Sequence, residues 1–220
     1  MTETRVALRL KSDFLKACGA WNCVKVKEYL DKGEDVNVRE GGHFALKYAA
    51  GPRKNKGGKR SSGLLLLEEL LRSPKIDVNI KDDEGKTAFM WACINGSLEV
   101  AKRMLNIRGL DFNHRDHQGH SAFMLSCIKG RTEIVDMLLK CHKLDFNIRD
   151  DTGKNALMLS CHGGWTSIVE KLLANPTIDI NCRDVNGNSA LTFAWGIGWQ
   201  VGWQKERRDI AAMLLRRASF

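Results

Sequence analysis

Three histidines recur at three-residue intervals, a residue type and spacing that can ligate zinc. His114, His117 and His120 form the pattern His-x-x-His-x-x-His. They straddle the segment Asp116–Gly119, however, which reads as a turn, and a turn does not place three imidazoles on one helical face. Asp116 is the only carboxylate close enough to support them. The pattern therefore favours polar surface residues over a metal site, and we predict no metal and no other cofactor.

Seven cysteines could act as nucleophiles or as disulfide partners. They are Cys18, Cys23, Cys93, Cys127, Cys141, Cys161 and Cys182. Because the number is odd and no pair has Cys-x-x-Cys spacing, a disulfide framework or zinc ribbon is disfavoured. The pattern indicates free thiols in a reducing compartment, and we expect a cytoplasmic or nuclear location. Cys93, Cys127 and Cys161 lie 34 residues apart, which indicates a recurring small buried residue instead of three nucleophiles.

Catalytic signatures are missing from the sequence. It contains no Gly-x-Ser-x-Gly elbow, no phosphate-binding loop and no His-Glu-x-x-His motif. His43, His142 and His162 are isolated. We therefore predict that the protein is not an enzyme.

The last residues read Arg216-Arg217-Ala218-Ser219-Phe220. This segment is similar to the substrate pattern of a basic-directed, cyclic-nucleotide-dependent kinase, and a phosphate on Ser219 would add about −2 charge beside two arginines. The alternative is that the cations only favour the end of a helix.

Length and composition limit the class of protein. The chain has 220 residues, of which 43% are hydrophobic and 28% are charged. Its longest aliphatic run is Leu64–Leu67, far short of the roughly 20 apolar residues of a membrane-spanning helix, so we predict no membrane insertion. Charged residues at positions 3, 5 and 9 argue against a signal peptide. The net charge of +9 permits an acidic partner.

The chain repeats itself. A branched or aromatic residue followed by Asn recurs with the asparagines 42, 34, 34 and 34 residues apart, at Asn37, Asn79, Asn113, Asn147 and Asn181. An Asp-x-x-Gly segment and an Ala followed by Leu or Phe keep the same phase in the last four units. A fixed period of this length is typical of stacked supersecondary units.

One period predicts a turn and two helices. Asp82–Gly85 suits a type I turn that ends on a left-handed residue, a conformation that glycine adopts without steric cost. We expect a first helix over about 87–94, ended by Gly96, and a second over about 98–106. A last helix is expected over 210–215. Because neither helix of a unit buries its apolar face alone, the units must stack.

Residues 150–161, with Gly164, Leu172-Leu173 and Ile180-Asn181, give the chain a resemblance to the ankyrin repeat family. The resemblance implies an all-α ankyrin-repeat solenoid of about six turn–helix–helix units with two inserted loops. The family's Thr-Pro-Leu-His opening lacks its proline and histidine here, and the matching segments begin at Thr87, Ser121, Asn155 and Ser189. Their hydroxyl or amide groups can still cap the first helix, and methionine at the histidine position predicts apolar packing instead of polar links.

We expect a single domain of six units. Residues 1–36 form an N-terminal capping unit, and 37–78 form a unit with a basic insertion at 51–63. Residues 79–112, 113–146 and 147–180 are regular repeats, and 181–220 form a C-terminal unit with a Trp/Gly-rich insertion at 195–206.

The first insertion is rich in cations and glycines. Its cations are Arg53, Lys54, Lys56, Lys59 and Arg60. The composition is typical of a solvated loop, which the fold tolerates cheaply. It is also compatible with a nuclear import signal, a nucleic-acid contact or an acidic-protein contact. No aromatic residue lies between the cations, so base stacking is not expected there.

The second insertion contains Trp195, Trp199 and Trp203, separated by glycines. We favour an interpretation in which the tryptophans cover the apolar end of the solenoid, where a terminal unit lacks a neighbour. The alternative is an aromatic hot spot for a partner.

The recurrent asparagines can bond to neighbouring backbone at the entrance of each turn. The family resemblance implies a further property, hydroxylation by an oxygen-dependent asparaginyl hydroxylase, which is favoured by a leucine eight residues earlier. Leu71, Leu105, Leu139 and Leu173 occupy that position before Asn79, Asn113, Asn147 and Asn181. The repeat core needs the same leucines, so the match is partly automatic.

The resemblance implies a non-catalytic protein-interaction module, a scaffold or adaptor that binds a protein partner along its turn tips and the concave face of its first helices. We expect a monomer. The matching positions, with two tryptophans of the second insertion, are Asp83, Glu84, Lys86, Ile94, Asn95, His117, Gln118, His120, Ile128, Lys129, Asp151, Thr152, Lys154, His162, Trp199 and Trp203. The alternative is binding of nucleic acid or another anionic surface through the basic loop at 52–60, which predicts steep salt dependence.

Overall fold

The computed structural model describes residues 2–51, 62–196 and 204–218, with side chains for all of these except residues 2–9, 62, 204, 207 and 218. The chain divides into two compact units, Met1–Asp111 and Phe112–Phe220. Several predicted functional residues lie outside the described residues: Arg53, Lys54, Lys56, Lys59, Arg60, Trp199, Trp203 and Ser219.

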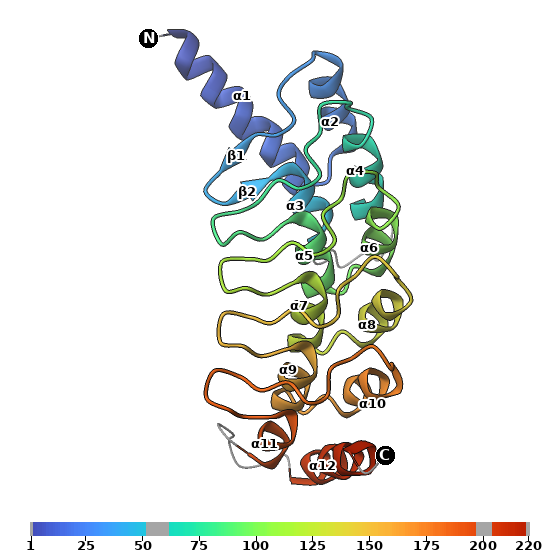
Figure 1. Ribbon diagram of the computed structural model, residues 1–220. Helices are drawn as coiled ribbons and strands as arrows, with labels where there is room; N and C mark the ends of the chain where they lie inside the picture. Colours follow the sequence, from blue (N-terminus) through green and yellow to red (C-terminus); the bar gives the residue numbers. More distant parts are fainter. Residues whose placement is uncertain (1, 52–61, 197–203, 219–220) are drawn as a thin grey trace. The chain divides into compact units, whose positions relative to one another are not determined.

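Unit 1 is built from helix pairs in two layers (Figure 1). Helices α1, α3 and α5 contact one another in sequence, α2, α4 and α6 do the same, and each helix of the first layer contacts its successor in the second. A short antiparallel hairpin, β1 with β2, precedes α3 and pairs Arg39 with Phe44 and Glu40 with His43. The elements are α1 (Thr2–Gly19), α2 (Cys23–Asp31), β1 (Arg39–Glu40), β2 (His43–Phe44), α3 (Ala45–Ala49), α4 (Ser62–Leu70), α5 (Ala88–Asn95) and α6 (Leu98–Met104).

Unit 2 has the same two layers. Helices α7, α9 and α11 form one column, and α8, α10 and α12 form the other, with the turn loops projecting from the first column (Figure 1). The elements are α7 (Ala122–Ile128), α8 (Thr132–Leu139), α9 (Ala156–His162), α10 (Thr166–Ala174), α11 (Ala190–Trp195) and α12 (Gln204–Ala218). The structure thus confirms the predicted all-α solenoid of paired helices.

The predicted helix starts are confirmed by their caps. The Thr87 hydroxyl accepts a hydrogen bond from the Met90 N–H at 3.4 Å, and the Asn155 amide oxygen accepts one from the Met158 N–H at 3.0 Å. Ser121 and Ser189 cap α7 and α11 in the same way. Such caps satisfy backbone donors that a helix cannot pair internally.

Two predicted helix boundaries are wrong. Helix α6 ends at Met104 instead of residue 106, because Asn106 donates its N–H to Arg103 in a tighter turn. Helix α12 runs over Gln204–Ala218 instead of 210–215. Its polar first turns contain no glycine or proline and are rich in good helix formers, although they lack the apolar spacing on which the prediction relied.

Methionine replaces the family histidine as an apolar core residue, as predicted. Met90, Met124 and Met158 are 0–1% exposed. Cys93, Cys127 and Cys161 are fully buried in the first helices. Both recurring positions therefore serve the core, which leaves the outer face of each first helix for other roles.

The predicted end-covering role fails for the first tryptophan of the second insertion. Trp195, at the end of α11, is 68% exposed. It follows the buried Ala194 and occupies the repeat position that holds Cys161 in the unit before.

None of the described helices has the length and apolar character that crossing a membrane requires.

Candidate functional site: turn tips and the face of the first helices

Each regular turn is held by one buried aspartate. In the turn of residues 150–154, Asp150 Oδ1 accepts hydrogen bonds from the backbone N–H groups of Thr152 and Lys154, both at 2.9 Å. The Asp150 N–H donates to the Lys154 carbonyl, and Gly153 adopts a φ of +80°. The other turns use Asp82, Asp116 and Asp184 identically. Because the turn satisfies its own backbone donors, the side chains at its tip are not needed to close it.

In unit 1 the turn aspartate also anchors two side chains. Asp82 Oδ2 accepts hydrogen bonds from the Lys47 ammonium at 2.8 Å and from the Trp91 indole N–H at 2.7 Å. The Lys47 nitrogen lies 4.4 Å from the centre of the Trp91 ring, a cation–π contact. Burial raises the pKa of the Asp82 carboxyl, but bonds from Lys47, the Lys86 backbone and Trp91 outweigh it, so the net pKa is lowered.

Three predicted contact residues of unit 1 have structural duties instead. Ile94 is only 9% exposed, and Lys86 is 8% exposed and pairs with Glu84. The Asn95 amide donates to the Ala50 carbonyl of the preceding helix pair at 3.0 Å. These positions were expected to be free of core duty, and that expectation is wrong, because Ile94 and Lys86 are buried and Asn95 bonds to the preceding helix pair. Of the predicted set in unit 1, Asp83 and Glu84 are exposed.

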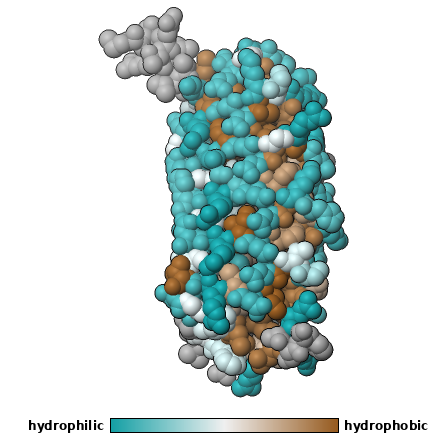
Figure 2. All heavy atoms as spheres, viewed as in Figure 1, coloured by the Kyte–Doolittle hydropathy of each residue, from teal (hydrophilic) through white to brown (hydrophobic). Residues whose placement is uncertain are grey.

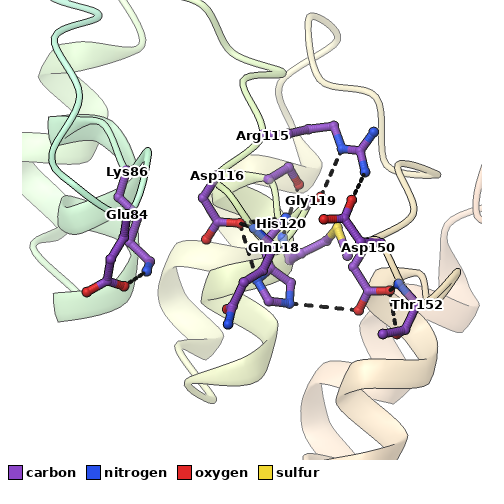
Figure 3. A network of polar contacts seen from close by, with 12 residues as sticks. Glu84, Lys86, Arg115, Asp116, Gln118, Gly119, His120, Asp150 and Thr152 are labelled. Atoms are coloured by element: carbon purple, nitrogen blue, oxygen red, sulfur yellow. Dashed lines mark hydrogen bonds and ion pairs between the residues drawn. The ribbon is translucent and has the colours of Figure 1, made fainter.

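The turn tips of unit 2 expose His117, Gln118 and Thr152. His120 lies between two aspartates of successive turns, with Nδ1 3.4 Å from Asp116 Oδ1 and Nε2 3.8 Å from Asp150 Oδ2 (Figure 3). Its side chain is mostly buried, so His120 links turns, although it was predicted to contact a partner.

The first helices of unit 2 end in exposed polar residues. Lys129, which follows α7, and His162, the last residue of α9, are exposed, and Ile128 is half-buried. Lys154 lies over the Phe193 ring at 5.3 Å, and the His162 ring meets the same ring edge-on at 5.8 Å. Partial burial lowers the pKa of His162, and the charge of Lys154 lowers it further. Both effects favour the neutral form of the His162 ring.

A series of arginines beside the turns was missed by the sequence analysis. Arg115, Arg149 and Arg183 each donate to the carbonyl of the glycine four residues later, at 2.9–3.1 Å; the first of these bonds is drawn in Figure 3. Arg115 also pairs with the exposed Asp151 at 2.9 Å. The arginines recur 34 residues apart, a signal that lay in the sequence.

The recurrent asparagines join successive turn loops, which confirms their predicted backbone role. Asn147 donates its amide to the Thr177 carbonyl at 2.7 Å and accepts the Asp179 N–H at 2.8 Å. Asn37, Asn79 and Asn113 make equivalent pairs. Among the described residues, the Asn181 side chain makes no such pair of bonds to another turn loop.

We expect Asn147→Ala to lower the free energy of unfolding by about 1–2 kcal/mol, because two inter-repeat hydrogen bonds are lost. Asn181→Ala removes the same side chain without these bonds and should stay within about 0.5 kcal/mol of the wild type. Urea unfolding of both variants checks the prediction. Equal losses would show that the inter-loop bonds contribute nothing.

The cysteines of the first helices are not nucleophiles in this fold. Burial raises the pKa of the Cys127 thiol to about 12, and it raises the pKa values of Cys93 and Cys161 as well. Cys23 and Cys141 are half-buried, and the other five cysteines are buried.

A thiol titration should therefore separate two classes. A chromogenic disulfide reagent at pH 8 is expected to modify Cys23 and Cys141 in the folded protein and the five buried thiols only after unfolding, because thiolate formation and access are both suppressed by burial. A buried thiol that reacts at the rate of the half-buried pair would contradict this assignment. Cys23→Ser with Cys141→Ser is the control that should abolish the fast phase.

The surface offers recognition groups and no metal cluster in the part of the chain that the structure describes. Hydrophilic residues cover most of the face shown in Figure 2, and hydrophobic residues appear between them in separate spots. Polar tips on internally satisfied turns can form hydrogen bonds and ion pairs with another molecule without refolding.

Comparison with known proteins agrees with this architecture. Residues 60–150 match a family model described as ankyrin repeats in three copies, and residues 152–185 match a model of the single ankyrin repeat. The chain is similar to the crystal structure of the ankyrin repeat protein EF0377, with a TM-score of 0.75 and 23% identity over 92% of this chain and 96% of that one. No match was found among curated proteins. The structure repeats a unit of one turn and two helices. Together with the two family matches, this repeat shows that the chain belongs to the ankyrin repeat family.

Proposed function

We propose that the protein is a non-catalytic scaffold or adaptor that binds a protein partner through its turn tips and the exposed face of its first helices. Ankyrin repeats are generally protein–protein interaction modules. One observation carries the proposal for this chain. The buried turn aspartates satisfy the tip backbone, so the exposed side chains of His117 and Gln118 are not needed to close their turn, whereas the Thr152 hydroxyl donates a hydrogen bond to Asp150 Oδ1.

The contact surface is centred on unit 2 in this proposal. We define the unit 2 face as His117, Gln118, Lys129, Thr152 and His162, all of which are exposed. Its side chains come from two successive turns and from the ends of α7 and α9. Exposed polar residues on a rigid frame favour recognition over packing.

The test is a pull-down from nuclease-treated lysate with the whole chain. In one variant, Lys129→Glu reverses a charge on the unit 2 face and His162→Glu adds a negative charge there. This double variant should no longer retain the specific partners, while its thermal midpoint stays unchanged. Lys140→Glu with His142→Glu is the matched control, because both residues are exposed and follow α8 on the other layer. Release by both pairs, or by neither, would refute the assignment of the face.

A third variant in the same pull-down distinguishes protein binding by the unit 2 face from nucleic-acid binding by the basic loop. A variant with serine in place of the five loop cations between 53 and 60 should retain the same partners. Loss of binding with nuclease or with this variant, together with steep salt dependence, would move the function to the basic loop.

A further inference from the structure

The arginines of the unit 2 turns share one geometry. The side chains of Arg115, Arg149 and Arg183 each reach the carbonyl of the glycine in their own turn. A guanidinium has further donors in the same plane, which suit a carboxylate. What these further donors contact differs from one turn to the next.

At the first junction the next turn supplies a carboxylate. The Asp151 N–H donates to the Gln118 carbonyl at 3.1 Å, and this bond sets the register between the two tips. In that register Asp151 Oδ1 accepts a hydrogen bond from Arg115 Nη2 at 2.9 Å. A Cβ atom placed on Gly119 would meet both of these side-chain atoms, so the pair lies directly against the turn glycine. In unit 1, Arg39 and Asp83 form an equivalent pair at 3.1 Å.

At the second junction the backbone register is the same and the carboxylate is missing. The Val185 N–H donates to the Thr152 carbonyl at 3.0 Å, just as Asp151 does one turn earlier. A Cβ placed on Gly153 would meet Arg149 Nη2 and the Val185 backbone. Valine thus occupies the place of the aspartate, and Arg149 Nη2 donates to the Arg183 carbonyl instead.

The result is an exposed group of two cations and one apolar side chain. Arg149 and Arg183 are exposed, and neither has a carboxylate partner among the described residues. Val185 is 69% exposed. The nearby Asp150 and Asp184 are buried; Oδ1 of each serves its own turn, Asp184 Oδ2 accepts from the Asn188 amide, and Asp150 Oδ2 faces His120.

We propose that Arg149, Val185 and Arg183, named here the Arg149 site, dock a segment of a partner protein in which an Asp or Glu stands beside an apolar residue. The partner's carboxylate supplies to Arg149 the negative charge that Asp151 supplies to Arg115 one turn earlier, and it bonds to the Arg149 N–H groups that do not reach the Gly153 and Arg183 carbonyls, with Arg183 adding positive charge. The apolar side chain covers Val185. The inference rests on the proposed function for the statement that the partner is a protein.

Charge complementarity favours this occupant. A planar guanidinium matches a carboxylate by two parallel hydrogen bonds, and unpaired arginines at a rim steer an acidic partner. Phosphate would satisfy the same donors, but it would leave Val185 uncovered. An acidic segment with an apolar neighbour satisfies all three residues.

The test selects random dodecapeptides displayed on phage against the whole protein. We expect enriched peptides to carry Asp or Glu next to an aliphatic or aromatic residue. The best of them, synthesised and labelled, should bind Val185→Asp at least about tenfold more weakly, because the new carboxylate fills the place on Arg149. Arg149→Gln should weaken binding similarly.

The matched control is Asp151→Val, which makes the reciprocal change one turn earlier and leaves the Arg149 site intact. It should bind the peptide at least as well as the wild type. Thermal midpoints of all variants establish that each is folded; these positions are exposed, so Val185→Asp should not lower its midpoint.

The following results would overturn the inference. Enriched peptides without an acidic residue would do so, as would equal binding to wild type and Val185→Asp. So would a labelled single-stranded oligonucleotide that binds the site while no acidic peptide does. Some peptides could bind Val185→Asp as tightly as the wild type but fail to bind the variant with Lys129→Glu and His162→Glu. That result would support the proposed function and contradict the Arg149 site. Selection of no peptide at all would contradict both.

Discussion

Asp82→Ala is expected to lower the free energy of unfolding by about 3 kcal/mol. The carboxylate is 4% exposed and accepts four hydrogen bonds, from two backbone N–H groups, Lys47 and Trp91. Alanine leaves all four donors without their acceptor, and the Lys47 ammonium, whose side chain is 19% exposed, without its counter-charge. Removing one partner of a buried ion pair costs more than the pair itself contributes. Urea unfolding followed by tryptophan fluorescence measures the loss.

The neighbouring aspartate is the control for Asp82. Asp83 has the same side chain one residue later, but it is 69% exposed and pairs with an exposed Arg39. Asp83→Ala should therefore cost no more than about 1 kcal/mol. A similar loss for the two variants would mean that the turn does not depend on its buried carboxylate.

The same carboxylate makes unit 1 sensitive to acid. Bonds and charges that outweigh burial lower the pKa of Asp82 below its ordinary value of 3.8 in the folded state. The folded protein therefore binds fewer protons than the unfolded chain near that pH, and the stability gained is full above 3.8 and is lost as the pH falls through the lower, folded value. In Asp82→Ala this part of the acid-induced loss should disappear, so the difference in stability between the wild type and the variant should narrow as the pH falls through the lowered, folded pKa of Asp82.

The repeat period was sufficient to predict the pairing of helices, because each unit leaves an apolar face that only a neighbour can cover. Thr87 and Asn155 also predicted the helix starts correctly, since a cap depends on residues within three positions of it. The turns, the helix caps and the buried methionines could therefore be predicted from residues close to them in the sequence. The end of α6 depended on one backbone bond of Asn106, which no residue pattern indicates.

The candidate site was less predictable because it depends on what lies across a junction. Ile94 occupies a variable repeat position, yet it is buried. The sequence suggested that Lys86 is an exposed cation, but only 8% of the residue is exposed. Repeat position alone does not give exposure, since Ile94 is buried whereas Ile128, at the same position of the next repeat, is half-buried.

Arg149, which has no carboxylate partner among the described residues, shows that a junction can also create a candidate site at an ordinary position. Val185 is an ordinary residue in a turn, and it gains meaning only because the backbone register places it where Asp151 stands one turn earlier. The spacing of 34 residues between Arg115, Arg149 and Arg183 was visible in the sequence. The direction in which the guanidinium groups of Arg115 and Arg149 reach, toward the next turn, came from the structure.

Gly130→Ala is the second substitution for which we expect a large effect, a loss of about 2–3 kcal/mol. Gly130 has a φ of +63°, a conformation that costs an L-residue about 1–2 kcal/mol. A Cβ there would also lie 2.8 Å from two carbon atoms of the Trp165 ring. The indole must move, and its hydrogen bond to the Ile128 carbonyl, 3.3 Å long, would be lost at a cost of about 1 kcal/mol.

A second glycine separates the backbone contribution from the steric one. Gly109 has a φ of +82°, but a Cβ there would meet nothing within 4 Å, so Gly109→Ala should cost only the backbone term of about 1–2 kcal/mol. Trp165→Ala provides the second test, because Gly130→Ala should cost less when the indole is already absent. If Gly130→Ala costs the same with and without Trp165, the ring does not constrain the glycine. The packing of Trp165 against Gly130 would then not be the reason that this turn requires a residue without a side chain.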